Sequence, residues 1–166
     1  FTMLEAYQAL ADYTDMMGLT EEVVSDLARE VTGGTSLTYQ GRELDLSRPF
    51  RRASMIELVS EKLGSDVDLD TPLDDLASLA RERGVEIEEG WSGARIISEI
   101  YEEVVEAEIW DPTFVTHQPV EISPLARRSA TDPRLADRFE LVIAGSEYAN
   151  AFSELNDPVE QRRMME

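Results

Sequence analysis

The stretch that most constrains the fold is the segment 138–157, which reads RFELVIAGSEYANAFSELND. Large apolar residues alternate with other residues over 139–143, which is the two-residue period of a β-strand with two different faces. The alternation resumes at Tyr148, after the turn-forming residues 144–146. This pattern predicts a β-hairpin with a three-residue loop.

The predicted hairpin has an acidic face. With a three-residue loop, Glu140 lies opposite Asn150, and Phe152 and Glu154 follow on the same face. Glu147 points to the other face unless a bulge near the turn re-aims it. A buried carboxylate without a partner costs several kcal/mol or takes up a proton. We therefore expect this face to meet a cation, although glutamate on a strand is also common on a solvated face.

Composition restricts the partners. Acidic residues outnumber basic ones 35 to 15, and the net charge is −20. A surface this negative repels phosphate backbones and suits metal ions and amines, so this segment alone is not expected to bind nucleic acid. The absence of cysteine excludes disulfides and thiol chemistry. No apolar run approaches membrane-spanning length and no signal-peptide pattern opens the chain, so we expect a cytoplasmic protein without a membrane partner.

The remaining patterns predict an α+β protein in which strands at both ends enclose a helical stretch from about 20 to 110. Phe1–Tyr7 is predicted as a strand, followed by a helix that stops at Gly18. A second helix is expected from Thr20 to Gly33, with Val23, Val24, Leu27 and Val31 facing inward. The other expected elements are a hairpin turning at Gln40-Gly41, helices over 54–64 and 72–84, a longest helix from Gly93 to Pro112, and strands over 113–116 and 120–125.

Several catalytic signatures are absent from the sequence. It contains no Walker-type phosphate loop, GxGxxG, GxSxG or HExxH motif. Nucleophilic triads and zinc hydrolysis are therefore poorly supported. His117 is the only histidine, and its position near a proline favours a structural role.

Three stretches resemble the catalytic core of class II lysyl-tRNA synthetases: FTMLEAYQALADY at the start, PTFVTHQPVEISPLARR at 112–128 and RFELVIAGSEYANAFSELNDPVEQR at 138–162. The segment GWSGARIISEIYEEVVEA is also similar to that family, so the resemblance covers essentially the whole chain. It implies an antiparallel class II sheet with flanking helices and a helical insertion. Residues 1–19 would belong to the catalytic core at the end of the second signature motif, 20–110 would be mainly helical insertion and connecting helices, and 111–166 would be core strands with the active-site hairpin.

The resemblance implies ATP-dependent activation of lysine to lysyl-adenylate and its transfer to the 3′ end of tRNA(Lys). By similarity, Glu140 and Glu147 would hold Mg²⁺ against the ATP phosphates, which requires a bulge or twist near 144–147. Phe1 would stack on adenine. The lysine-binding residues implied by the family are Glu5, Tyr7 and Glu154 around the ε-ammonium, Asn150 at the carboxylate end and Phe152 along the pocket.

The family also has functional parts that would fall before Phe1 or after Glu166. They are two arginines that bind ATP and the motif of the dimer interface; tRNA contacts also lie elsewhere. We therefore expect this chain to be a piece of a longer, homodimeric protein and to be inactive alone. Three alternatives remain open: a paralogue that lysylates elongation factor P, the synthetase half of a protein that lysylates membrane lipid, and a non-catalytic lysine-binding or regulatory module.

Overall fold

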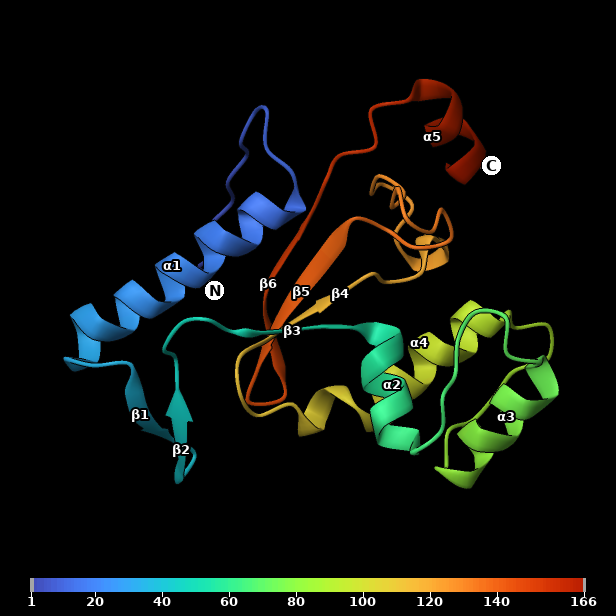
Figure 1. The fold of residues 1–166 in the computed structure, drawn as a ribbon, viewed down its shortest axis with the longest axis horizontal. Helices are drawn as coiled ribbons and strands as arrows, with labels where there is room; N and C mark the ends of the chain where they lie inside the picture. Colours follow the sequence, from blue (N-terminus) through green and yellow to red (C-terminus); the bar gives the residue numbers. More distant parts are fainter. Residues whose placement is uncertain (1, 166) are drawn as a thin grey trace.

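A four-stranded sheet at the centre of the molecule separates one long helix from a group of three shorter helices (Figure 1). The computed structural model describes residues 2–165. The strands lie in the order β3-β4-β5-β6, with β3 and β4 parallel and the other neighbours antiparallel. Their bounds are Arg51–Ser54 for β3, Thr113–Thr116 for β4, Arg138–Ile143 for β5 and Ser146–Phe152 for β6.

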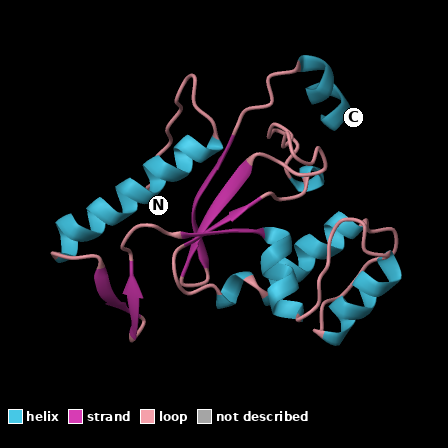
Figure 2. Ribbon diagram, viewed as in Figure 1, coloured by secondary structure: helices cyan, strands magenta, loops and turns pink. Residues whose placement is uncertain are grey.

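The helices and a small hairpin cover the two faces of this sheet, and Figure 2 shows the α+β arrangement that the sequence predicted. One group comprises α2 (Met55–Leu63), α3 (Leu73–Glu82) and α4 (Gly93–Val104); the other comprises α1 (Tyr13–Thr32) with the hairpin of β1 (Ser36–Tyr39) and β2 (Arg42–Asp45). The short elements η1 (Glu106–Glu108) and η2 (Val120–Ile122) and the final helix α5 (Pro158–Met165) complete the chain. Within residues 2–165, no helix is both long and apolar enough to cross a membrane.

Strand alternation sorts the buried side chains into two main cores. Val115 and Val142 point toward α2, α3 and α4, whereas Phe114, Phe139 and Leu141 pack with the α1 side. All five are fully buried. Burial of each such side chain stabilises the fold by roughly 1.5–3 kcal/mol, so both faces of the sheet are held by apolar packing.

Helix α1 is one continuous element of 20 residues, so the predicted stop at Gly18 and restart at Thr20 are wrong. Asp12 caps the helix, and its capping box with Asp15 satisfies the first N–H groups. The Thr20 hydroxyl donates to the Met16 carbonyl within the helix (2.8 Å) rather than capping a new one. Packing of the buried positions Glu21, Ser25 and Ala28 therefore outweighs the weak helix propensity of glycine.

The orientation of α1 agrees with the prediction only in part: Val24 packs against the core as expected, but the other three residues predicted to face inward do not. Leu27 and Val31 are 57% and 79% exposed, and Val23 lies at the surface as well. Two polar contacts fix the buried face instead: the Glu21 carboxylate accepts from the Phe50 N–H (2.6 Å), and the Ser25 hydroxyl donates to the Leu46 carbonyl (2.5 Å). Apolar spacing could not reveal these contacts.

Several local predictions are confirmed, because capping and turn chemistry act over a few residues. The β1–β2 hairpin turns at Gln40-Gly41, where both φ angles are positive. Ser54 and Glu57 form the predicted capping box of α2, and Gly64 ends that helix in the left-handed region.

Two helix boundaries differ from the sequence prediction. Pro72 is the residue before α3 rather than its first residue, and the Thr71 hydroxyl accepts from the Asp68 N–H instead of capping the helix. Helix α4 ends at Val104, well before Pro112, and is shorter than α1. The η1 turn follows it, and its neighbouring carbonyls receive N–H groups from the β5–β6 hairpin.

The two segments predicted as strands at 1–7 and 120–125 do not form strands where they are described. Phe1 lies outside the described residues, and 2–7 runs without a strand partner. Residues 120–122 form η2, because the flanking Pro119 and Pro124 cannot donate to a ladder. Strand β3 was not predicted, because its sequence, RRAS, contains no β-branched or aromatic residue.

The turn of the β5–β6 hairpin is fixed to the chain around η1. The N–H groups of Ala144 and Gly145 donate to the carbonyls of Trp110 (2.9 Å) and Ile109 (2.7 Å). A Cβ atom at Gly145 would lie only 2.8 Å from the Ala107 carbonyl oxygen. Glycine is therefore needed at this position both for the backbone angle, φ 72°, and for the close approach.

We predict that Gly145→Ala destabilises the protein by about 2–3 kcal/mol, because left-handed strain and a backbone clash act together. Gly33→Ala is the matched control: Gly33 has φ 82°, but a methyl group added there would meet nothing within 4 Å. We expect that control to lose only about 1 kcal/mol. Urea denaturation measures both, and equal losses would show that contact with η1 does not hold the turn.

Candidate active site

The register of the β5–β6 hairpin contains a β-bulge. Glu140 lies opposite Asn150, as predicted. The ladder then shifts between Leu141 and Val142, and Tyr148 is the extra residue on β6. A bulge of this kind places two residues of one strand against one residue of the other and reverses the alternation beyond it.

The bulge decides the direction of Glu147. Val142 pairs with Glu147, and Val142 shares its sheet face with Glu140 because the two are separated by one residue on β5. Both glutamates therefore lie on the face that carries α4. The bulge lies one residue beyond the predicted stretch 144–147. The loop holds two residues rather than the predicted three, and the remaining residue is the bulged Tyr148 in β6.

Glu140 is paired, contrary to the expectation of an unpaired acid. The Arg138 guanidinium donates to its carboxylate at 2.5 Å, and the two side chains are 16% and 14% exposed. Burial raises the pKa of the Glu140 carboxyl, the charge of Glu147 raises it further, and Arg138 and Gln118 oppose the rise. Arg138 was not predicted as part of the site, although its position two residues before Glu140 on one strand could have indicated it.

Helix α4 and η1 bring more groups to the same place. The Tyr101 side chain is 1% exposed, and its hydroxyl has no hydrogen-bond partner among the residues described. Burial, followed by the charges of Glu106, Glu140, Glu147 and Glu102, raises the pKa of this tyrosine. Sequence reasoning did not link these residues to the hairpin, because contact between the turn and η1 creates the cluster.

Glu140 and Glu147 are the two carboxylates that the family resemblance implies for Mg²⁺, and they lie on one face of the hairpin. Residues 2–165 contain no group of three or more acidic or histidine side chains placed to hold a metal ion. Mg²⁺ commonly uses one or two carboxylates and completes its shell with water and substrate phosphates. Glu140 and Glu147 could supply those two carboxylates.

A cavity of about 710 Å³ lies between the N-terminal loop and β6, the edge strand of the sheet. Tyr7, on this loop, is 84% exposed, so little packs over it. Arg127 also lines the cavity, but the Asp137 carboxylate binds it at 2.8 Å. The structure brings to this cavity all the residues implied for lysine binding: Glu5, Tyr7, Asn150, Phe152 and Glu154.

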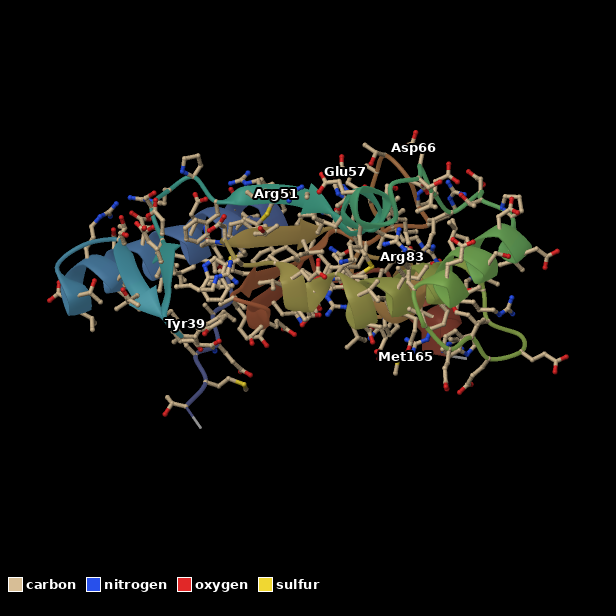
Figure 3. The ribbon with its side chains drawn as sticks, turned by 90° about the horizontal axis from the view of Figure 1, so that it is seen from below. Tyr39, Arg51, Glu57, Asp66, Arg83 and Met165 are labelled. Atoms are coloured by element: carbon tan, nitrogen blue, oxygen red, sulfur yellow. The ribbon has the colours of Figure 1, made fainter. Side chains whose placement is uncertain are left out.

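Of the other predicted positions, His117 does not line this cavity. Phe1, implied for adenine stacking, is outside the described residues. His117 has Nδ1 at 3.1 Å from the Thr116 hydroxyl, and its ring meets Tyr13 edge-on, which agrees with a structural role. Figure 3 shows carboxylate oxygen atoms around much of the outline, as expected for an acidic chain.

The structure is consistent with a class II synthetase domain. It has an antiparallel hairpin with an acidic face, a cavity next to that hairpin and helices on both sides of the sheet. Residues 1–166 match the family described as tRNA synthetases class II (D, K and N), and the chain belongs to this family.

Its curated relatives include lysine–tRNA ligases. The chain is 45% identical over 166 residues to that of Enterococcus faecalis, covering 100% of the chain and 33% of the relative. It is 49% identical over 164 residues to that of Pelotomaculum thermopropionicum, covering 98% and 32%. The Bacillus subtilis protein is 44% identical over 166 residues, with 100% and 33% covered. The chain thus spans about a third of the length of these relatives.

We predict that Glu106→Gln stabilises the chain at neutral pH. Burial and the charges of Glu140, Glu147 and Glu102 raise the pKa of the Glu106 carboxyl above its usual 4.5. The folded state then binds the proton of the Glu106 carboxyl more tightly than the unfolded state does. The contribution of this carboxyl to stability is therefore complete below pH 4.5 and is lost as the pH rises through the raised pKa. Glutamine avoids that loss.

Thermal unfolding between pH 4 and 8 tests this prediction. The melting temperature of Glu106→Gln should exceed that of the parent near pH 7, and the difference should shrink as the solution is acidified. Glu30→Gln, at an exposed position of α1, is the control and should show no such gain. A pH-independent difference for Glu106→Gln would contradict the acidic cluster.

Proposed function

We propose that this chain is part of the catalytic domain of a lysine–tRNA ligase, which activates lysine with ATP to lysyl-adenylate and transfers it to the 3′ end of tRNA(Lys). One observation carries the proposal: the five side chains that the family assigns to lysine line a single cavity. That cavity adjoins the hairpin whose face carries Glu140 and Glu147. A cytoplasmic location follows from this function.

Lysine recognition would depend on charge. Glu5 and Glu154 supply carboxylates to the cavity, Tyr7 supplies a hydroxyl, and Phe152 is half-buried beside them. A lysine ε-ammonium would neutralise these acids, and Asn150 would bind the carboxylate end. A neutral amino acid of similar size would leave the carboxylates unpaired, which is a strong basis for discrimination.

The ATP half of the site would use the acid pair. Glu140 and Glu147 would hold Mg²⁺, which would neutralise charge on the phosphates. The adenine-stacking role of Phe1 is part of this proposal and rests on the family resemblance alone. Contacts with tRNA and a second subunit would come from regions outside this chain, in keeping with its net charge of −20.

Calorimetric titration with L-lysine tests the proposal. We predict that the chain binds lysine and that Glu154→Gln weakens binding by about tenfold or more, because the ammonium loses a charged acceptor. L-Norleucine, which lacks the ammonium group, should bind no more tightly to the parent than lysine binds to the variant.

Glu82→Gln, at an exposed position of α3, is the matched control and should leave lysine affinity unchanged. Equal lysine binding by the parent and Glu154→Gln, or tight binding of norleucine, would contradict an ammonium pocket. A parent chain that binds no lysine would contradict the proposal that the described cavity is the amino-acid site.

A further inference from the structure

Arg138 spans the two halves of the proposed site. Its Nη2 donates to Glu140 Oε1 at 2.5 Å, and its Nε donates to Asn150 Oδ1 at 3.1 Å. Its Nη1 donates to the Ser123 hydroxyl at 2.8 Å. The guanidinium is thus anchored at Ser123, directly after η2, while it contacts Glu140 of the acid pair and Asn150, which lines the amino-acid cavity.

The contact with Asn150 has a consequence for the cavity. Because Asn150 Oδ1 accepts from Arg138, the amide is oriented with Nδ2 as its free donor. Nδ2 makes no hydrogen bond to the residues that the structure describes, and Asn150 lines the cavity. Arg138 therefore favours the amide orientation that can donate to a carboxylate.

The contact with Glu140 has a different consequence. Arg138 is the cation that neutralises this half-buried carboxylate in the structure. A divalent cation held by Glu140 and Glu147 would have to compete with the guanidinium for Glu140 Oε1. Because of this competition, the two glutamates would bind free divalent ions only weakly.

We propose that Arg138 is a positioning residue that couples the two halves of the site: it is the exchangeable counter-ion of Glu140 and it orients the Asn150 amide toward an amino-acid carboxylate. This inference rests on the proposed function for the identity of the two ligands. It predicts opposite effects on them when Arg138 is removed, whereas a merely structural ion pair would weaken both.

The experiment compares the parent with Arg138→Met, using electron paramagnetic resonance of free Mn²⁺ and calorimetry with L-lysine at about 0.15 M salt, where diffuse surface binding is screened. We expect Arg138→Met to bind Mn²⁺ about tenfold more tightly and lysine about tenfold more weakly, since a charge-assisted contact is lost in each half. Arg138→Lys keeps the positive charge but lacks the planar guanidinium. Its Mn²⁺ affinity should therefore lie close to that of the parent, whereas its lysine affinity should remain below that of the parent.

Two controls separate the site from the acidic surface. Arg134→Met removes an arginine that pairs with Asp132 and Asp70 away from the hairpin, and should change neither affinity. The Arg138→Met/Glu140→Gln double variant should lose the gain in Mn²⁺ affinity.

An Arg138→Met chain whose Mn²⁺ affinity is unchanged or lower overturns the inference, as does an unchanged lysine affinity where the parent binds lysine. A parent that binds no lysine contradicts the proposed function instead. In that case the Mn²⁺ titration still decides whether Arg138 is an exchangeable counter-ion.

Discussion

One extra residue in β6, Tyr148, determines which sheet face carries Glu147. Without it, the alternation of the strand would turn Glu147 away from Glu140. The bulge is supported at the turn, where the N–H groups of Ala144 and Gly145 bind carbonyls next to η1. The acidic site therefore depends on a backbone contact between the hairpin and a segment that precedes β4 in the chain.

The acidic composition of the chain produces local charge repulsion at this hairpin. Like charges that gather near a buried tyrosine destabilise the fold unless a cation joins them. Arg138 supplies one cation to Glu140, but burial and the charge of Glu147 still raise the pKa of the Glu140 carboxyl. Cationic ligands would relieve this repulsion, which links the electrostatics of the fold to the proposed chemistry.

The sequence predicted those features that depend on neighbouring residues. The hairpin pairing of Glu140 with Asn150 and the capping box at Ser54 were readable from short patterns, whereas the need for a bulge followed from the family roles of Glu140 and Glu147. The rotation of α1 was not, because Glu21 and Ser25 bind the backbone of a distant segment. Apolar spacing alone predicted the inward position of Val24 correctly but not those of Val23, Leu27 and Val31.

The same distinction applies to the candidate site. Family resemblance implied which residues would bind lysine, and the structure adds that they line one cavity. The positions of Tyr101 and Glu106 near the acidic face of the hairpin could not be predicted, because only the packing of α4 and η1 brings them there. Arg138 was visible in the sequence, but its double contact with Glu140 and Asn150 requires the strand register.

The bulge places the Glu147 carboxylate on the same sheet face as the Glu140 carboxylate, where its negative charge acts on Glu140. Nuclear magnetic resonance titration of the Glu140 side-chain carboxyl carbon tests it most directly, in the parent and in Glu147→Gln. The pKa of Glu140 should lie above its usual 4.5 in the parent and fall when Glu147 loses its charge. The same pKa of Glu140 in both proteins would contradict the account.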